Sequence, residues 1–67
     1  MNLGEAVIFE LNEYEIITQT DKAGLLRFEG QDWWIPKSQY RILNNKLYIA
    51  LWFYNKLKEG ESENETN

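Results

Sequence analysis

Residues 23–36, with the sequence AGLLRFEGQDWWIP, predict a β-hairpin. The first half is largely apolar, and its alternation places Leu26 and Phe28 on one face of a strand. Residues 29–32 form the turn, in which Gly30 supplies the positive φ that tight hairpin loops need. The two adjacent tryptophans then begin the second strand. This hairpin sets the class of the fold as β-rich.

Further strands are predicted on both sides of this hairpin. Upstream, residues 14–20 alternate with a period of two and include β-branched residues, and residues 6–9 form a short apolar run. Downstream, residues 40–43 continue in an extended conformation, residues 44–45 (Asn-Asn) form a turn, and residues 46–49 form the last strand.

Residues 50–58 predict a short C-terminal helix. Gly60 is placed to cap the end of this helix. Residues 59–67 hold four acids and no base, and predict a disordered acidic tail. The apolar residues of the helix fall at i, i+3, i+4 and i+7, which places them in one stripe: Ala50, Phe53, Tyr54 and Leu57.

Four to five short strands followed by one helix predict a mainly-β (α+β) domain over residues 1–58. We expect a small curved antiparallel sheet or partial barrel, with the helix over an open face or end. Pro36 lacks an N–H, so residues 34–37 should lie at a sheet edge or at the bend of a curved strand. The predicted core consists of Trp34, Trp52, Phe28, Leu26, Ile16, Ile49 and Phe53.

Composition disfavours several classes of protein. The 67 residues carry 7 basic and 11 acidic side chains, and without the four acids of the tail the charges of residues 1–58 balance. The chain has no Cys and no His, so disulfides, thiolate metal sites and the commonest proton shuttle are excluded. No apolar run reaches the ~18–20 residues of a membrane span, and residues 1–5 lack the basic start of a signal peptide. We therefore expect a cytoplasmic, non-enzymatic protein without metal, cofactor or membrane contact.

Residues 34–39, Trp-Ile-Pro-Lys-Ser-Gln, resemble the signature of a family of small phage and prophage proteins of unknown activity. Members carry an apolar strand and a Gly-containing turn before this signature, here residues 22–30. The positions that the resemblance marks as a structural motif are Trp34, Pro36, Ser38 and Trp52.

A second segment of that family, similar to Ile-Pro-Glu-Trp-Leu and followed by a Lys-rich helix, corresponds here to residues 49–53. Ala50 and Leu51 replace the usual Pro and Glu, so an apolar group stands where the family shows a charge. The resemblance covers residues 14–58. It implies a phage or mobile-element origin and a compact fold, and it carries over no catalytic residues.

The tryptophan pair and the segment after it each allow two interpretations. If Trp34 faces the core, Trp33 faces solvent or a partner as an interface anchor, or else packs on a neighbouring loop or the helix. Lys37 either contacts a phosphate or carboxylate or lies over an aromatic ring. Ser38 would bond the backbone that Pro36 leaves unpaired.

Apolar and acidic side chains outside the predicted core suggest further surfaces. Leu51, Tyr54, Leu25 and Ile17 remain once one face of each element is buried, and they predict a partner patch. Glu13 and Glu15 share a strand face, but such carboxylates need enclosure before they serve acid–base or metal chemistry. The acidic tail is either a solubilising segment or a polyanionic arm.

Two functions follow as hypotheses. The first is a small binding module that acts by protein–protein contact, either by self-association as a homodimer or by modulating a host protein. Its predicted anchors are Trp33, Leu51, Tyr54 and Tyr40. The second is a single-stranded nucleic-acid-binding protein in which rings stack on bases and cations meet phosphates. Its predicted contacts are Trp33, Lys37, Arg41 and Tyr40.

Overall fold

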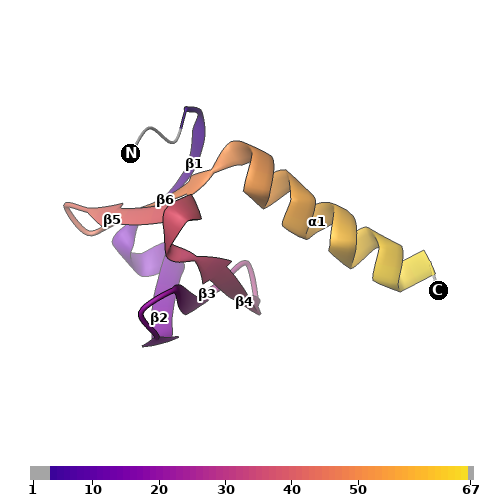
Figure 1. The fold of residues 1–67 in the computed structure, drawn as a ribbon, viewed down its shortest axis with the longest axis horizontal. Coiled ribbons are helices and arrows are strands. Elements are labelled where there is room, and N and C mark those ends of the chain that lie inside the picture. Colours follow the sequence, from indigo (N-terminus) through magenta and orange to yellow (C-terminus); the bar gives the residue numbers. More distant parts are fainter. Residues whose placement is uncertain (1–3, 67) are drawn as a thin grey trace.

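The computed structural model describes the backbone of residues 4–66 and the side chains of residues 4–60 (Figure 1). The mainly-β class with one C-terminal helix is confirmed. The described chain has six strands, more than the four to five expected, and two 3₁₀ turns. In chain order the elements are β1 (Ala6–Phe9), η1 (Leu11–Glu13), β2 (Tyr14–Gln19), β3 (Ala23–Phe28), β4 (Gln31–Pro36), η2 (Lys37–Gln39), β5 (Tyr40–Leu43), β6 (Lys46–Ala50) and α1 (Leu51–Thr66).

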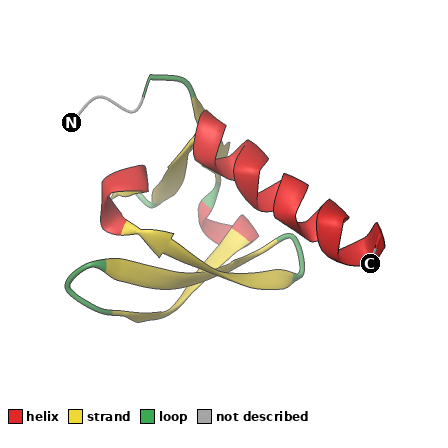
Figure 2. Ribbon diagram, turned by 45° about the vertical axis from the view of Figure 1, so that its right-hand side comes forward, coloured by secondary structure: helices red, strands yellow, loops and turns green. Residues whose placement is uncertain are grey.

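The strands form two antiparallel sheets of three strands each. One is the meander β2-β3-β4, and the other has the order β1-β6-β5, which brings the first strand beside the last. The sheets are not joined into a closed barrel (Figure 2). β4 lies at the edge of its sheet, so the edge position predicted for Pro36, its last residue, is confirmed.

Two predicted turns are present, and both are two-residue loops with positive φ. Glu29 (φ 54°) and Gly30 (φ 80°) join β3 to β4, so this turn is tighter than the four residues expected. Asn44 (φ 51°) and Asn45 (φ 65°) join β5 to β6. Positive φ at both central residues matches the right-handed twist of the flanking strands, which explains the presence of Gly30, Asn44 and Asn45, while Glu29 adopts the same conformation without being Gly or Asn.

The core lies between the two sheets and centres on aromatic rings. The Phe28 ring lies 4.7 Å from Phe9, 5.7 Å from Trp33 and 6.5 Å from Tyr54. Burial of the predicted core residues Leu26, Phe28 and Ile49 is confirmed. The buried cluster consists of Phe9, Leu26, Phe28, Ile35, Tyr40, Leu47 and Ile49.

The prediction that Trp34 is buried is wrong. Trp34 is 54% exposed, and its neighbour Trp33 packs against the core instead. The register explains this, because Trp33 pairs with the fully buried Leu26 while Trp34 pairs with Leu25 on the opposite face. In a strand, a change of phase by one residue exchanges the two faces.

Two other predicted core residues also lie at the surface. Trp52 is 58% exposed at the beginning of α1. Ile16 is exposed on β2, an edge strand whose ladder to β3 is interrupted between Ile16 and Thr18. Ile17 is the extra residue of this bulge, and such an insertion bends and twists an edge strand.

The helix is longer than predicted. α1 begins at Leu51, one residue later than expected, and its backbone continues to Thr66. Gly60 lies inside α1 and has no positive φ, so the predicted cap is wrong. The acidic tail was predicted over residues 59–67. The side chains of residues 61–67 and the backbone of Asn67 lie outside the described residues.

The predicted covering role of the helix is confirmed, since three members of its apolar stripe pack against the core: Phe53, Tyr54 and Leu57. In Figures 1 and 2, α1 leaves the end of β6 and extends away from the sheets at its C-terminal end. Among the helices of residues 4–66, none has the length and apolar character that a bilayer-crossing segment requires.

Candidate binding surfaces

The outer face of the β2-β3-β4 sheet carries an exposed tryptophan. Thr18, Leu25 and Trp34 are cross-strand partners and form one row across the three strands. Leu25 is half-buried in this row, and the bulge residue Ile17 beside Thr18 is exposed. We call Thr18, Leu25 and Trp34 the Trp34 row. Apolar groups that lie together at a surface, as Trp34 and Leu25 do here, mark contact sites more often than scattered ones do.

A row of charged residues borders the Trp34 row on the same face. The next row of cross-strand partners on this face consists of Glu15, Arg27 and Asp32. Arg27 donates from Nε to Asp32 Oδ1 at 2.7 Å and from Nη2 to Asp32 Oδ2 at 3.3 Å, and its Nη1 lies 3.8 Å from Glu15 Oε1. This bidentate geometry fixes the orientation of the Arg27 guanidinium. The hydrogen bond from Arg27 lowers the pKa of Asp32, and the same contact raises the pKa of Arg27.

The titration of Asp32 tests this ion pair. We expect its midpoint in the folded protein to lie below the about 3.9 of an unperturbed aspartate. The lowered pKa means that the pair contributes stability above the unfolded-state pKa, and that this contribution is lost as the pH falls through the folded-state pKa. The carboxyl ¹³C shift measured against pH checks this. Arg27→Gln should return the midpoint towards the ordinary value, and an unchanged midpoint would contradict the assignment.

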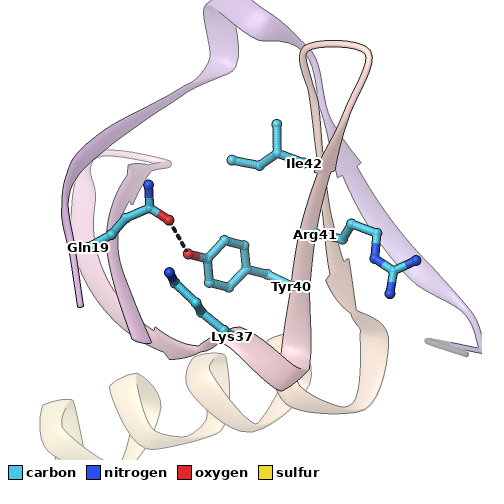
Figure 3. Close-up of a pocket in the computed structure, with 5 residues that line it drawn as sticks. All are labelled: Gln19, Lys37, Tyr40, Arg41 and Ile42. Carbon is cyan, nitrogen blue, oxygen red and sulfur yellow. Dashed lines mark hydrogen bonds between the residues drawn. The ribbon is translucent and has the colours of Figure 1, made fainter. Parts of the chain in front are cut away.

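A hollow of about 360 Å³ lies between β2 and β5 (Figure 3). The Tyr40 hydroxyl donates to Gln19 Oε1 at 2.8 Å and so connects the two sheets. Burial raises the pKa of Tyr40. Arg41 extends from β5 away from this hydrogen bond, whereas Lys37 lies on the same side as Tyr40. The lining residues are Gln19, Lys37, Tyr40, Arg41 and Ile42.

Tyr40 is therefore not the exposed contact that the sequence predicted. Only 7% of it is exposed, because it begins β5 with its ring turned into the core, where it lies against Gly24 of β3. Gln19 was not among the predicted site residues. The period-two pattern of β2 predicts a strand there, but no local signal shows which residue of the other sheet it faces.

Trp33 and Tyr54, predicted as anchors, instead join α1 to the β3-β4 hairpin. Trp33 Nε1 donates to the Phe28 carbonyl at 3.3 Å, and Lys58 Nζ lies 6.0 Å from the Trp33 ring centre. The Tyr54 hydroxyl donates to Glu29, with both carboxylate oxygens at 2.9 Å, and Lys58 Nζ contacts Glu29 at 3.3 Å. The alternative that Trp33 packs within the protein is the one that the structure supports.

The beginning of α1 forms a second apolar surface. Leu51 is half-buried, and its backbone N–H donates to the Glu5 carbonyl at 2.9 Å. Trp52 stands edge-on to the Phe53 ring with 5.5 Å between the ring centres. Leu51 and Trp52 contribute to an open hollow of about 380 Å³. The structure does not bring the predicted patch together, because Leu51 lies at the start of α1 and Tyr54 packs against the core. Leu25 lies in the Trp34 row, with Ile17 beside it.

The segment after Pro36 folds as η2. Lys37 N donates to the Lys22 carbonyl at 2.8 Å, which ties this turn to the beginning of β3. The Ser38 hydroxyl accepts from Gln39 Nε2 at 3.1 Å, so the predicted bond from Ser38 to the backbone around Pro36 is replaced by a side-chain contact. Lys37 lies beside Tyr40 in Figure 3.

The acids that suggested metal or acid–base chemistry have separate local partners. Glu13 Oε1 accepts from the Glu10 N–H at 2.8 Å inside η1, and Glu15 approaches Arg27. Within the part of the chain that the structure describes, no three potential metal ligands lie close enough to hold an ion.

Comparison of the chain with protein-family models, with curated proteins and with solved structures gave no match. The resemblance of residues 34–39 to phage proteins therefore stays a prediction.

Proposed function

We propose that this protein is a non-enzymatic binding module that acts by protein–protein contact through the Trp34 row. The observation that carries the proposal is the 54% exposure of Trp34 beside Leu25, on the outer face of the three-stranded β2-β3-β4 sheet. A tryptophan held on a strand loses little conformational freedom on binding and offers a large apolar area. Such residues dominate the binding energy of protein interfaces.

The surroundings of Trp34 support this assignment. Interfaces combine an apolar centre with a polar rim that stays solvated. Here the apolar centre is the pair Leu25 and Trp34, and the rim is the row of Arg27 with Asp32 and Glu15. The ion pairs hold the rim side chains in one arrangement before a partner arrives, which reduces the ordering cost of binding.

The partner is either a second copy of the chain or a host protein that the module modulates. A twofold contact through the Trp34 row would bury one tryptophan from each copy. The second form, modulation of a host protein, rests on the resemblance of residues 34–39 to phage proteins. The two forms differ in one measurement, because only self-association depends on the concentration of this protein alone.

Substitution of Trp34 by Ala tests the proposal, with Trp52→Ala as the matched control because Trp52 is equally exposed. We expect Trp34→Ala to weaken the contact by about 2 kcal/mol, or about thirtyfold, and Trp52→Ala to leave it unchanged. Sedimentation equilibrium up to millimolar protein measures self-association, and affinity capture from host extract followed by mass spectrometry measures a host partner. A monomer at every concentration that also retains no protein sensitive to Trp34→Ala contradicts the proposal.

Single-strand binding of nucleic acid is a second candidate. The observation that favours it is that Lys37 and Arg41 line one hollow and form no ion pair within the described residues. Because Trp33 and Tyr40 are enclosed, Trp34 would have to supply the stacking surface. This candidate predicts that a deoxythymidine oligonucleotide quenches tryptophan fluorescence, less so as salt is raised. Absence of quenching at low salt excludes it.

A further inference from the structure

The facing edges of β2 and β5 are held together by side chains. Each strand lies at the edge of its sheet, and the two do not pair with each other in the described structure. Two hydrogen bonds span the opening: the Tyr14 hydroxyl donates to the Asn45 carbonyl at 3.2 Å, and the Tyr40 hydroxyl donates to Gln19 at 2.8 Å. Between these bridges the backbone edges of both strands remain without a strand partner.

The tight turn between β5 and β6 determines which residues of β5 form backbone hydrogen bonds to β6. A two-residue loop makes the closing residues, Leu43 and Lys46, a pair that exchanges backbone hydrogen bonds. Bonding alternates along an antiparallel ladder, so Arg41 also bonds to β6. The N–H and C=O groups of Tyr40 and Ile42 therefore point to the open edge. An unpaired row of this kind is a template for another extended chain.

The same residues line the hollow of about 360 Å³. This volume lies at the lower end of the about 300–1,000 Å³ typical of ligand pockets, and an open slot between strands suits a chain rather than an enclosed molecule. Figure 3 shows the Tyr40 ring extending from β5 towards Gln19, with Ile42 further along the same strand. The opening thus combines a backbone edge with a partly apolar lining.

The charge of the opening is positive. Lys37 and Arg41 have no acidic partner within the described residues, whereas Arg27, Lys46 and Lys58 each contact an acid. Arg41 projects on the opposite side of β5 from the Tyr40–Gln19 contact. A strand added beside β5 would present alternate side chains to these two sides, one set beside Arg41 and the other over the hollow.

We propose that the opening between β2 and β5 binds an extended acidic peptide segment of another protein, which adds as a strand to the edge of β5. Main-chain groups of Tyr40 and Ile42 pair with the peptide backbone, as in other cases of β-strand addition. Arg41 contacts its carboxylates on one side of β5, and small apolar side chains alternate with these acids and lie over the hollow on the other side, where Tyr40 and Lys37 are. This site is separate from the Trp34 row and does not require that surface to be functional.

The test uses the full-length protein and three capped eight-residue peptides. The first alternates Glu and Val, the second alternates Lys and Val, and the third is the Glu/Val peptide with methylated backbone nitrogens. We expect the Glu/Val peptide to shift the NMR amide signals of residues 40–43 and to slow hydrogen exchange at Tyr40 and Ile42. It should bind at least about tenfold more tightly than either of the other two, since the Lys/Val peptide carries the opposite charge and the methylated peptide lacks the backbone donors.

Charge reversal at the site supplies the protein-side test. Arg41→Glu should weaken binding of the Glu/Val peptide about tenfold. Lys56→Glu, a reversal in α1 at an exposed residue outside the hollow, should leave it unchanged and serves as the control. Absence of amide shifts at millimolar Glu/Val peptide, or equal binding of all three peptides, overturns the proposal. Trp34→Ala should not alter peptide binding, so failure at one surface is distinguishable from failure at the other.

Discussion

Replacing Phe28 with Ala should lower the free energy of unfolding by about 3–5 kcal/mol. Phe28 is 2% exposed and meets three other aromatic rings, from β1, β4 and α1, so its loss removes contacts to both sheets and the helix. A domain of this length has a total stability of only about 3–10 kcal/mol. The variant should therefore lose a large fraction of its total stability, and its unfolding midpoint should fall sharply.

Urea denaturation followed by far-UV circular dichroism measures this effect. Phe28→Leu keeps most of the apolar volume, and we expect it to retain a cooperative transition at a lower midpoint. Trp52→Ala removes a larger ring from an exposed position and should change stability by less than about 1 kcal/mol. Equal losses in Phe28→Ala and Trp52→Ala would show that the ring cluster does not centre on Phe28.

Replacing Gly24 with Ala should cost about 1–3 kcal/mol, although the change adds a single methyl group. A Cβ atom at Gly24 would lie 3.0 Å from Tyr40 Cζ and closer still to the Tyr40 hydroxyl. Gly24 is buried in β3, and the Tyr40 hydroxyl donates to Gln19, so a displacement of the ring would disturb that hydrogen bond. The substitution should also alter the opening between β2 and β5.

A double-mutant cycle identifies the cause. Tyr40→Phe removes the hydroxyl that the new methyl would meet first, and alone it should cost about 0.5–1.5 kcal/mol for the lost hydrogen bond. If the hydroxyl is the obstacle, the double variant loses less stability than the sum of the two single variants. Gly60→Ala is the matched control, because a Cβ there meets open space within α1, and it should stabilise the protein slightly. Strict additivity of Gly24→Ala and Tyr40→Phe would contradict the proposed clash.

Local patterns in the sequence were sufficient to predict the main secondary-structure elements of the fold. Residues 23–36 predicted the hairpin because a turn glycine separates two apolar runs, and residues 44–45 predicted the second tight turn because Asn tolerates positive φ. The apolar spacing of Phe53, Tyr54 and Leu57 identified the face of α1 that covers the core. Each of these signals depends on interactions between residues close in the chain, which is why they could be recognised without the structure.

The candidate surfaces depended on the pairing between strands. Alternation shows that Trp33 and Trp34 face opposite ways, but only the pairing of Trp33 with buried Leu26 decides which ring is exposed. The hollow between β2 and β5 likewise unites Gln19 with Tyr40, 21 residues later, by a contact for which the chain carries no local signal. By itself the sequence determined a mainly-β chain with two positive-φ turns and a C-terminal covering helix. The tertiary structure decided which tryptophan is exposed and which strand edges stay open, because long-range pairing sets the phase of each strand.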